Sequence, residues 1–166
     1  MSDDRPTGVP TRLVLPVPEL AERLPGAVIT LLAPFLPADA VDDGVVFELE
    51  AFFAALVPFA YVLGDPARFP SGTAYLPPQP AAAIRRLTHD LRLAFPELVA
   101  PHASVHAATP HLVLPAGVEV VTPVEVHARE ALLVTEGASS APGDTGSAGV
   151  AGVRVLARFR FGTSAA

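Results

Sequence analysis

Apolar positions along this 166-residue chain follow two different spacings. Runs at residues 12–17 and 27–35 are rich in β-branched and large apolar side chains and stop at prolines, which predicts two short strands. Two further strands are predicted at residues 59–63 and 73–76, joined by a turn-rich segment. We expect this second pair of strands to hydrogen-bond to each other.

A three-and-four spacing of apolar residues marks two helices. Between Asp39 and Val57 it predicts a helix, and acidic residues suit its N-terminal end. The buried face of this helix is predicted to hold Val45, Val46, Leu49, Phe52, Phe53 and Leu56. A second helix is predicted from residue 80 to 95, since Pro80 lies near its start and Pro96 follows its end.

The C-terminal part of the chain adds strands but no helix. We predict a histidine-bearing loop at 101–109, strands at 111–114, 124–135 and 153–161, and a flexible connector at 137–152. More strands than helices, without regular alternation, predict an α+β fold rather than a doubly wound sheet. We expect one domain over residues 12–162, preceded by a disordered N-terminus at 1–11.

Composition narrows the class of protein. Hydrophobic residues make up 51% and charged residues 17%, which is typical of a chain that folds around a core. Residues 1–6 are polar and acidic, and no apolar run reaches a membrane-spanning length, so we expect a cytoplasmic protein with no membrane association. The absence of cysteine excludes disulfides and thiolate chemistry.

The net charge of −6 disfavours polymeric nucleic acid as a partner, because such binding depends on many Lys and Arg side chains. A small phosphorylated or otherwise anionic ligand, held by a few arginines, is compatible with that total. We expect the protein to be a monomer.

Two polar residues stand in short apolar strands. Residues two apart share a strand face, so Thr30 lies with Val28 and Leu32, and His111 lies with Val113. Thr30 and His111 would face a cleft if the helices cover the alternate residues, which are Ile29, Leu31, Leu112 and Leu114.

The run LPGAVITLLAPF at residues 24–35 resembles the segment of the bacterial 2'-5' RNA ligase family that carries its first His-x-Thr motif. Other matching pieces follow in the family's order: Pro58-Phe59, Arg68-Phe69-Pro70, TAYL at 73–76, Phe95-Pro96-Glu97, Thr109-Pro110-His111-Leu112 and residues 154–162. The resemblance implies a bilobal 2H-phosphoesterase-like fold, with two small antiparallel sheets facing a central cleft and helices on the outside.

The resemblance also implies a catalytic site, which this sequence keeps in part. In the family, each lobe presents a His-x-Thr or His-x-Ser motif, and the two histidines flank a phosphate as general acid and base while the hydroxyls hydrogen-bond its oxygens. We expect that this protein requires no metal or organic cofactor. Here Val28 stands at the first histidine and Thr30 is kept, while His111 is kept and Val113 stands at the second hydroxyl. A positioned general acid or base contributes about a hundred- to ten-thousandfold in rate, so ordinary cyclic phosphodiesterase activity should be weak or lost.

Further candidates for ligand binding lie outside the two motifs. Strict alternation on the last strand places Arg154, Arg158 and Arg160 on one face, where they could clamp a phosphate or carboxylate. His102 and His106 lie in the loop just before the second motif and could substitute for the missing histidine, and His106 is also a candidate for substrate binding. A metal site built from these histidines is disfavoured, because prolines interrupt the segment and no carboxylate lies within it.

Three functions fit these residues. The first is a divergent phosphoesterase that uses His111 as acid or base and Thr30 as a hydrogen-bond donor. The second is an inactive family member that binds a small ligand or a protein partner. The third is a cleft redirected to another biosynthetic acid/base reaction.

Overall fold

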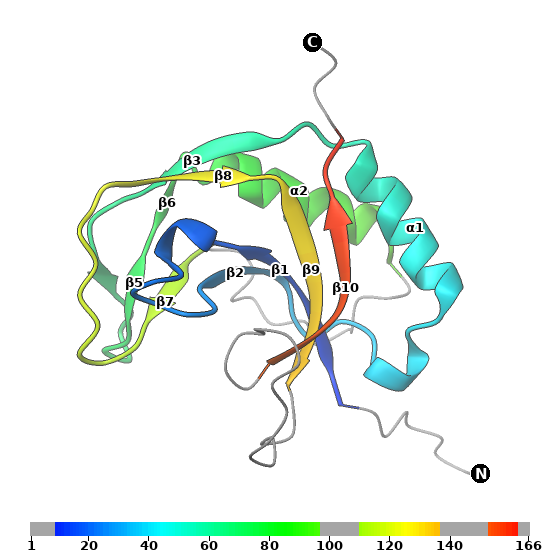
Figure 1. The fold of residues 1–166 in the computed structure, drawn as a ribbon, viewed down its shortest axis with the longest axis horizontal. Coiled ribbons are helices and arrows are strands. Elements are labelled where there is room, and N and C mark those ends of the chain that lie inside the picture. Colours follow the sequence, from blue (N-terminus) through cyan, green and yellow to red (C-terminus); the bar gives the residue numbers. More distant parts are fainter. Residues whose placement is uncertain (1–8, 97–109, 137–152, 163–166) are drawn as a thin grey trace.

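The computed structural model describes residues 9–96, 110–136 and 153–162 (Figure 1). In chain order its elements are β1 (Thr11–Pro16), η1 (Pro18–Leu20), β2 (Val28–Leu32), η2 (Ala38–Ala40), α1 (Asp43–Ala54), β3 (Phe59–Leu63), β4 (Ala67–Arg68), β5 (Ala74–Leu76), β6 (Pro78–Gln79), α2 (Ala82–Ala94), β7 (Leu112–Leu114), β8 (Val124–Ala128), β9 (Glu130–Glu136) and β10 (Val153–Arg160). The predicted loop at 101–109 and connector at 137–152 lie outside the described residues.

The strands form three antiparallel sheets in an α+β arrangement. Their orders are β10-β9-β1-β2, β6-β3-β8 and β4-β5-β7. The predicted fold class is therefore confirmed, but the strands divide into three sheets where two were expected. Helix α2 lies behind the four-stranded sheet and α1 lies beside β10 (Figure 1).

Both predicted helices are present. Helix α1 begins at Asp43 because the Asp42 side chain accepts a hydrogen bond from the Val45 amide at 2.9 Å and caps the helix. The apolar face predicted for this helix packs in or against the core, and Phe53 is fully buried. Its ring stacks on Phe159 at 5.4 Å and on Phe161 at 5.8 Å, which fixes α1 to the C-terminal strand.

The expected pairing of residues 59–63 with 73–76 is wrong. β3 pairs with β6 and β8, whereas β5 pairs with β4 and β7. The turn-rich segment folds into its own small hairpin, because Phe69 accepts a hydrogen bond from Gly72, whose φ of +92° suits glycine. Both edges of β3 are thereby left to strands more distant in sequence.

The long strand predicted at 124–135 is also wrong, since it is two strands in two different sheets. The break falls at Arg129, between β8, which pairs with β3, and β9, which pairs with β1 and β10. The sequence of residues 124–135 does not reveal this change of sheet, because β8 and β9 have similar strand-forming residues and differ only in the distant strands with which they pair.

Two bulges correct the predicted faces of the four-stranded sheet. In β2 the register passes from Leu13↔Leu32 to Val14↔Thr30, so Leu31 is the extra residue. Leu32 consequently joins Leu31 in the main core. Strict alternation had predicted that Leu32 shares the face of Thr30, and this prediction is wrong. Residue 156 is the corresponding extra residue in β10.

Candidate active site

A cavity of about 260 Å³ lies between β2 and β7, and we call it the motif cleft. It is lined by Arg12 from β1, by Val28 and Thr30 from β2, by His111 and Val113 beside and within β7, and by Leu24, Pro25, Gly26, Ala27 and Pro115. Both sequence motifs thus reach one cavity, although they belong to different sheets.

Burial of alternate residues turns the motif side chains toward the motif cleft. Ile29 in β2 and Leu112 in β7 are buried in the main core, which leaves Thr30 and His111 half-buried at the cavity wall. The division of faces predicted from sequence is found here. Leu31 and Leu114 lie with the core residues, as expected.

Two aromatic rings hold the His111 imidazole in place. Phe69 and Tyr75 stack on each other with ring centroids 4.1 Å apart. Their rings stand nearly perpendicular to the imidazole, at 4.9 Å and 5.9 Å. These contacts orient the ring by packing, so the position of His111 is set by the β4–β5 hairpin as well as by β7.

Arg12 is a site residue that the sequence analysis missed. It lies on β1, the neighbour of β2, and its side chain lines the motif cleft. Its Nε is buried and has no hydrogen-bond partner among the described residues. A buried guanidinium donor is stabilised by an acceptor, and an anion in the motif cleft would supply one. The available signal was a lone arginine at the start of an apolar strand.

The C-terminal arginines do not form the single face that was predicted. The bulge at Leu156 leaves Val155 beside Val134 on the motif face, so Arg154, opposite Thr135, lies on the other face. The alternation rule failed because the extra residue reverses the sides beyond it.

Arg158 and Arg160 share the sheet face of Thr30, but at the far edge of the sheet. The register runs from Thr30 through Val14 and Leu132 to Arg158, which spans three strand spacings or roughly 14 Å. Arg158 donates to Glu130 Oε1 at 2.7 Å. Arg160 lines a different cavity, and His106 lies outside the described residues.

The motif cleft therefore offers one imidazole, one hydroxyl and one guanidinium. Val28 and Val113 also line the cleft, and they stand where the resemblance implies the first motif's histidine and the second motif's hydroxyl residue. Such a set can bind an anion and move one proton, and it lacks a second proton-transferring side chain among the residues that line it. Within the described ranges, no group of three His, Asp or Glu side chains is arranged to hold a metal ion.

One protein-family model matches residues 13–119 of this chain, and both motif strands lie inside the match. The chain belongs to the 2'-5' RNA ligase superfamily. No curated protein sequence gives a significant match. No helix in the described part of this superfamily member is long and apolar enough to cross a membrane.

Solved structures share the fold of this 2'-5' RNA ligase superfamily member. E. coli LigT complexed with 3'-AMP is 16% identical, with a TM-score of 0.56 over 92% of this chain and 98% of LigT. The protein TT0787 of Thermus thermophilus is 18% identical, with a TM-score of 0.59 over 92% of this chain and 97% of that protein. The structure of LigT complexed with phosphate is 16% identical to this chain, with a TM-score of 0.53 over 93% of this chain and 98% of LigT.

Proposed function

We propose that the motif cleft binds a small phosphorylated or otherwise anionic compound and that His111 transfers a proton to or from it. The observation that carries the proposal is that Arg12 of β1, Thr30 of β2 and His111, just before β7, line one cavity. Thr30 would donate a hydrogen bond to a phosphate oxygen. Arg12 would neutralise the charge of that group through paired N–H donors.

A single histidine restricts the chemistry. Two-histidine hydrolysis needs an acid and a base on opposite sides of the phosphate, and Val28 cannot transfer a proton. A reaction that needs one acid or base, with charge stabilised by Arg12, fits the residues better than rapid cyclic phosphodiester hydrolysis. LigT has been crystallised in complex with 3'-AMP and with phosphate, which supports a phosphate-bearing ligand for the present protein.

Ligand binding without turnover is the second candidate. The observation in its favour is the apolar wall made by Val28 and Val113 at both altered motif positions. Under this function Arg12, Thr30 and His111 hold the anion and no bond is broken. The sequence-based assignment of Arg154, Arg158, Arg160 and His106 to ligand binding stays a prediction, as do the cytoplasmic location, the monomeric state and the independence from cofactors.

The test separates the two candidates by measuring binding and turnover on the same protein. We expect His111→Ala to abolish turnover of any active compound in a panel of nucleoside 2',3'-cyclic phosphates and phosphate monoesters. His89→Ala, which removes an exposed histidine on α2, is the matched control. Turnover that survives His111→Ala would exclude the acid/base role, and binding of these phosphates without turnover would leave the second candidate.

A further inference from the structure

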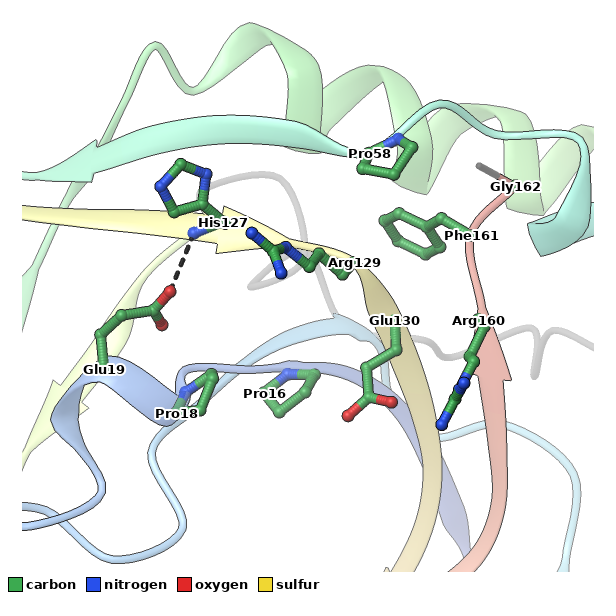
Figure 2. Close-up of a pocket in the computed structure, with 10 residues that line it drawn as sticks. All are labelled: Pro16, Pro18, Glu19, Pro58, His127, Arg129, Glu130, Arg160, Phe161 and Gly162. Atoms are coloured by element: carbon green, nitrogen blue, oxygen red, sulfur yellow. Dashed lines mark hydrogen bonds between the residues drawn. The ribbon is translucent and has the colours of Figure 1, made fainter. Parts of the chain in front are cut away.

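A second cavity of about 520 Å³ lies at the junction of β8 and β9, and none of its lining residues lines the motif cleft. We call it the junction pocket (Figure 2). It is lined by Pro16, Pro18, Glu19, Pro58, His127, Arg129, Glu130, Arg160, Phe161 and Gly162. The volume lies in the range of pockets that take small organic molecules.

The apolar part of the junction pocket is rigid. Three of its lining residues are prolines, whose rings keep the backbone fixed. The Phe161 ring is buried and stacked on Phe53 and on Phe59, so the small part of it that lines the pocket is held in place. A flat apolar group could pack here without ordering mobile side chains, which lowers the entropy lost on binding.

The carboxylates of the junction pocket already have partners. Glu19 accepts a hydrogen bond from the His127 amide at 3.0 Å, drawn as the dashed line in Figure 2. Glu130 accepts from Arg158 at 2.7 Å. Both acidic groups are therefore used to hold the walls in place.

Two guanidinium groups in the same pocket have no such partner. The side chains of Arg129 and Arg160 form no hydrogen bond or ion pair with another described residue. Arg129 comes from the break between β8 and β9, and Figure 2 shows its guanidinium group extending between His127 and Phe161. The lining therefore holds two guanidinium groups and two carboxylates, and the carboxylate of Glu130 is already paired with Arg158 outside the lining.

We propose that the junction pocket is a binding site for a small organic anion that joins a flat apolar body to a phosphate or carboxylate. Arg129, which extends toward His127, and Arg160, whose register partner is Glu130, offer guanidinium hydrogen bonds to the anionic group from two sides of the pocket (Figure 2). The apolar body packs on the proline rings, beside Phe161. The junction pocket shares no lining residue with the motif cleft, although Pro16 of the one and Val28 of the other are register partners. This inference does not depend on the function proposed for His111.

Calorimetric titration of the full chain with 2-naphthyl phosphate tests the proposal, with 2-naphthol and inorganic phosphate as half-ligands. We expect 2-naphthyl phosphate to bind more tightly than either half-ligand. Arg129→Gln and Arg160→Gln should each weaken it about tenfold, because a hydrogen bond to a charged group contributes about 1.5 kcal/mol or more. Arg86→Gln, an exposed position on α2, should not change the affinity.

The Arg12→Gln variant distinguishes the two cavities, since naphthyl phosphate could also enter the motif cleft. Loss of binding in Arg12→Gln, with full binding in Arg129→Gln and Arg160→Gln, would overturn the junction pocket and favour the motif cleft. Absence of any 2-naphthyl phosphate binding to the native protein would overturn the junction pocket as well. Loss in the two pocket variants with retention in Arg12→Gln would support it, whatever the outcome for His111.

Discussion

Thr30 in β2 and His111, which immediately precedes β7, line the same cavity although β2 and β7 belong to different sheets. They are 81 positions apart in the sequence, and the contact between β2 and β7 brings them together. The two altered motif positions, Val28 and Val113, line this cavity as well. Function in the motif cleft can therefore be tested by single substitutions on either strand.

Val28→His should restore a second proton-transferring group to the motif cleft. Because Val28 already lines the cavity beside Thr30, an imidazole at this position would face the site of the bound phosphate. We expect the rate of nucleoside 2',3'-cyclic phosphate hydrolysis to rise by about a hundredfold or more over the native protein. The rate is measured by chromatography of the nucleotide products.

Val28→Phe serves as the control for Val28→His, since it adds a ring of comparable shape that cannot transfer a proton. An equal change of rate in the two variants would show that the effect is one of packing. No gain in Val28→His, with the fold intact by circular dichroism, would contradict the placement of the reacting phosphate between β2 and β7.

Arg12→Gln should weaken the binding of phosphate monoesters to the motif cleft. Its buried Nε has no acceptor among the described residues, and a charged hydrogen bond contributes about 1.5–3 kcal/mol, which corresponds to roughly tenfold or more in affinity. Calorimetric titration with 3'-AMP measures the change. Arg85→Gln, exposed on α2, is the matched loss of one guanidinium group and should keep the native affinity.

Tyr61 should make the protein less stable at alkaline pH. Burial raises the pKa of its hydroxyl well above the ordinary value, and the negative charge of Glu19 raises it further. In the unfolded chain this hydroxyl ionises near pH 10, while the folded protein keeps the proton. The free energy of unfolding should therefore fall as the pH rises above about 10.

Tyr61→Phe should remove this part of the alkaline loss. At pH 7 the variant should be as stable as the native protein or slightly more stable, because the buried hydroxyl has no hydrogen-bond partner among the described residues. Urea unfolding at pH 7 and at about pH 10.5 gives both comparisons. A large loss of stability at pH 7 would show that the hydroxyl has an important partner.

Gly162→Ala should destabilise the fold. A Cβ at this position would collide with the backbone oxygen of Ala54, and it would lie 3.3 Å from that of Leu56. Backbone atoms cannot give way as a side chain can, so we expect a loss of about 1–3 kcal/mol in the free energy of unfolding. Thermal and urea unfolding measure it.

Gly44→Ala is the matched control for Gly162→Ala. Its Cβ would meet only the side-chain oxygen of Asp42, at 3.2 Å, and alanine is the better helix former. Equal losses of stability in the two variants would contradict the close approach of residue 162 to the end of α1.

The sequence by itself determined the local elements and most of the faces. The apolar spacing located α1 and α2, and Asp42 and the prolines marked helix boundaries. Alternation also placed Thr30 and His111 on the faces that line the cleft, because burial of every second residue is a local property of a strand. The run at residues 24–35 and the shorter pieces that follow it in the family's order carried the resemblance.

Only the tertiary structure decided which strands pair and where the register shifts. β3 and β5 lie in different sheets, and the break at Arg129 sends β8 and β9 to different partners. The bulges at Leu31 and Leu156 move Leu32 into the core and separate Arg154 from Arg158. Strand pairing and bulges depend on hydrogen bonds between residues far apart in the chain. The alternation of apolar and polar residues depends only on residues close together in one strand. For the same reason Arg12 became a site residue only when β1 was seen beside β2.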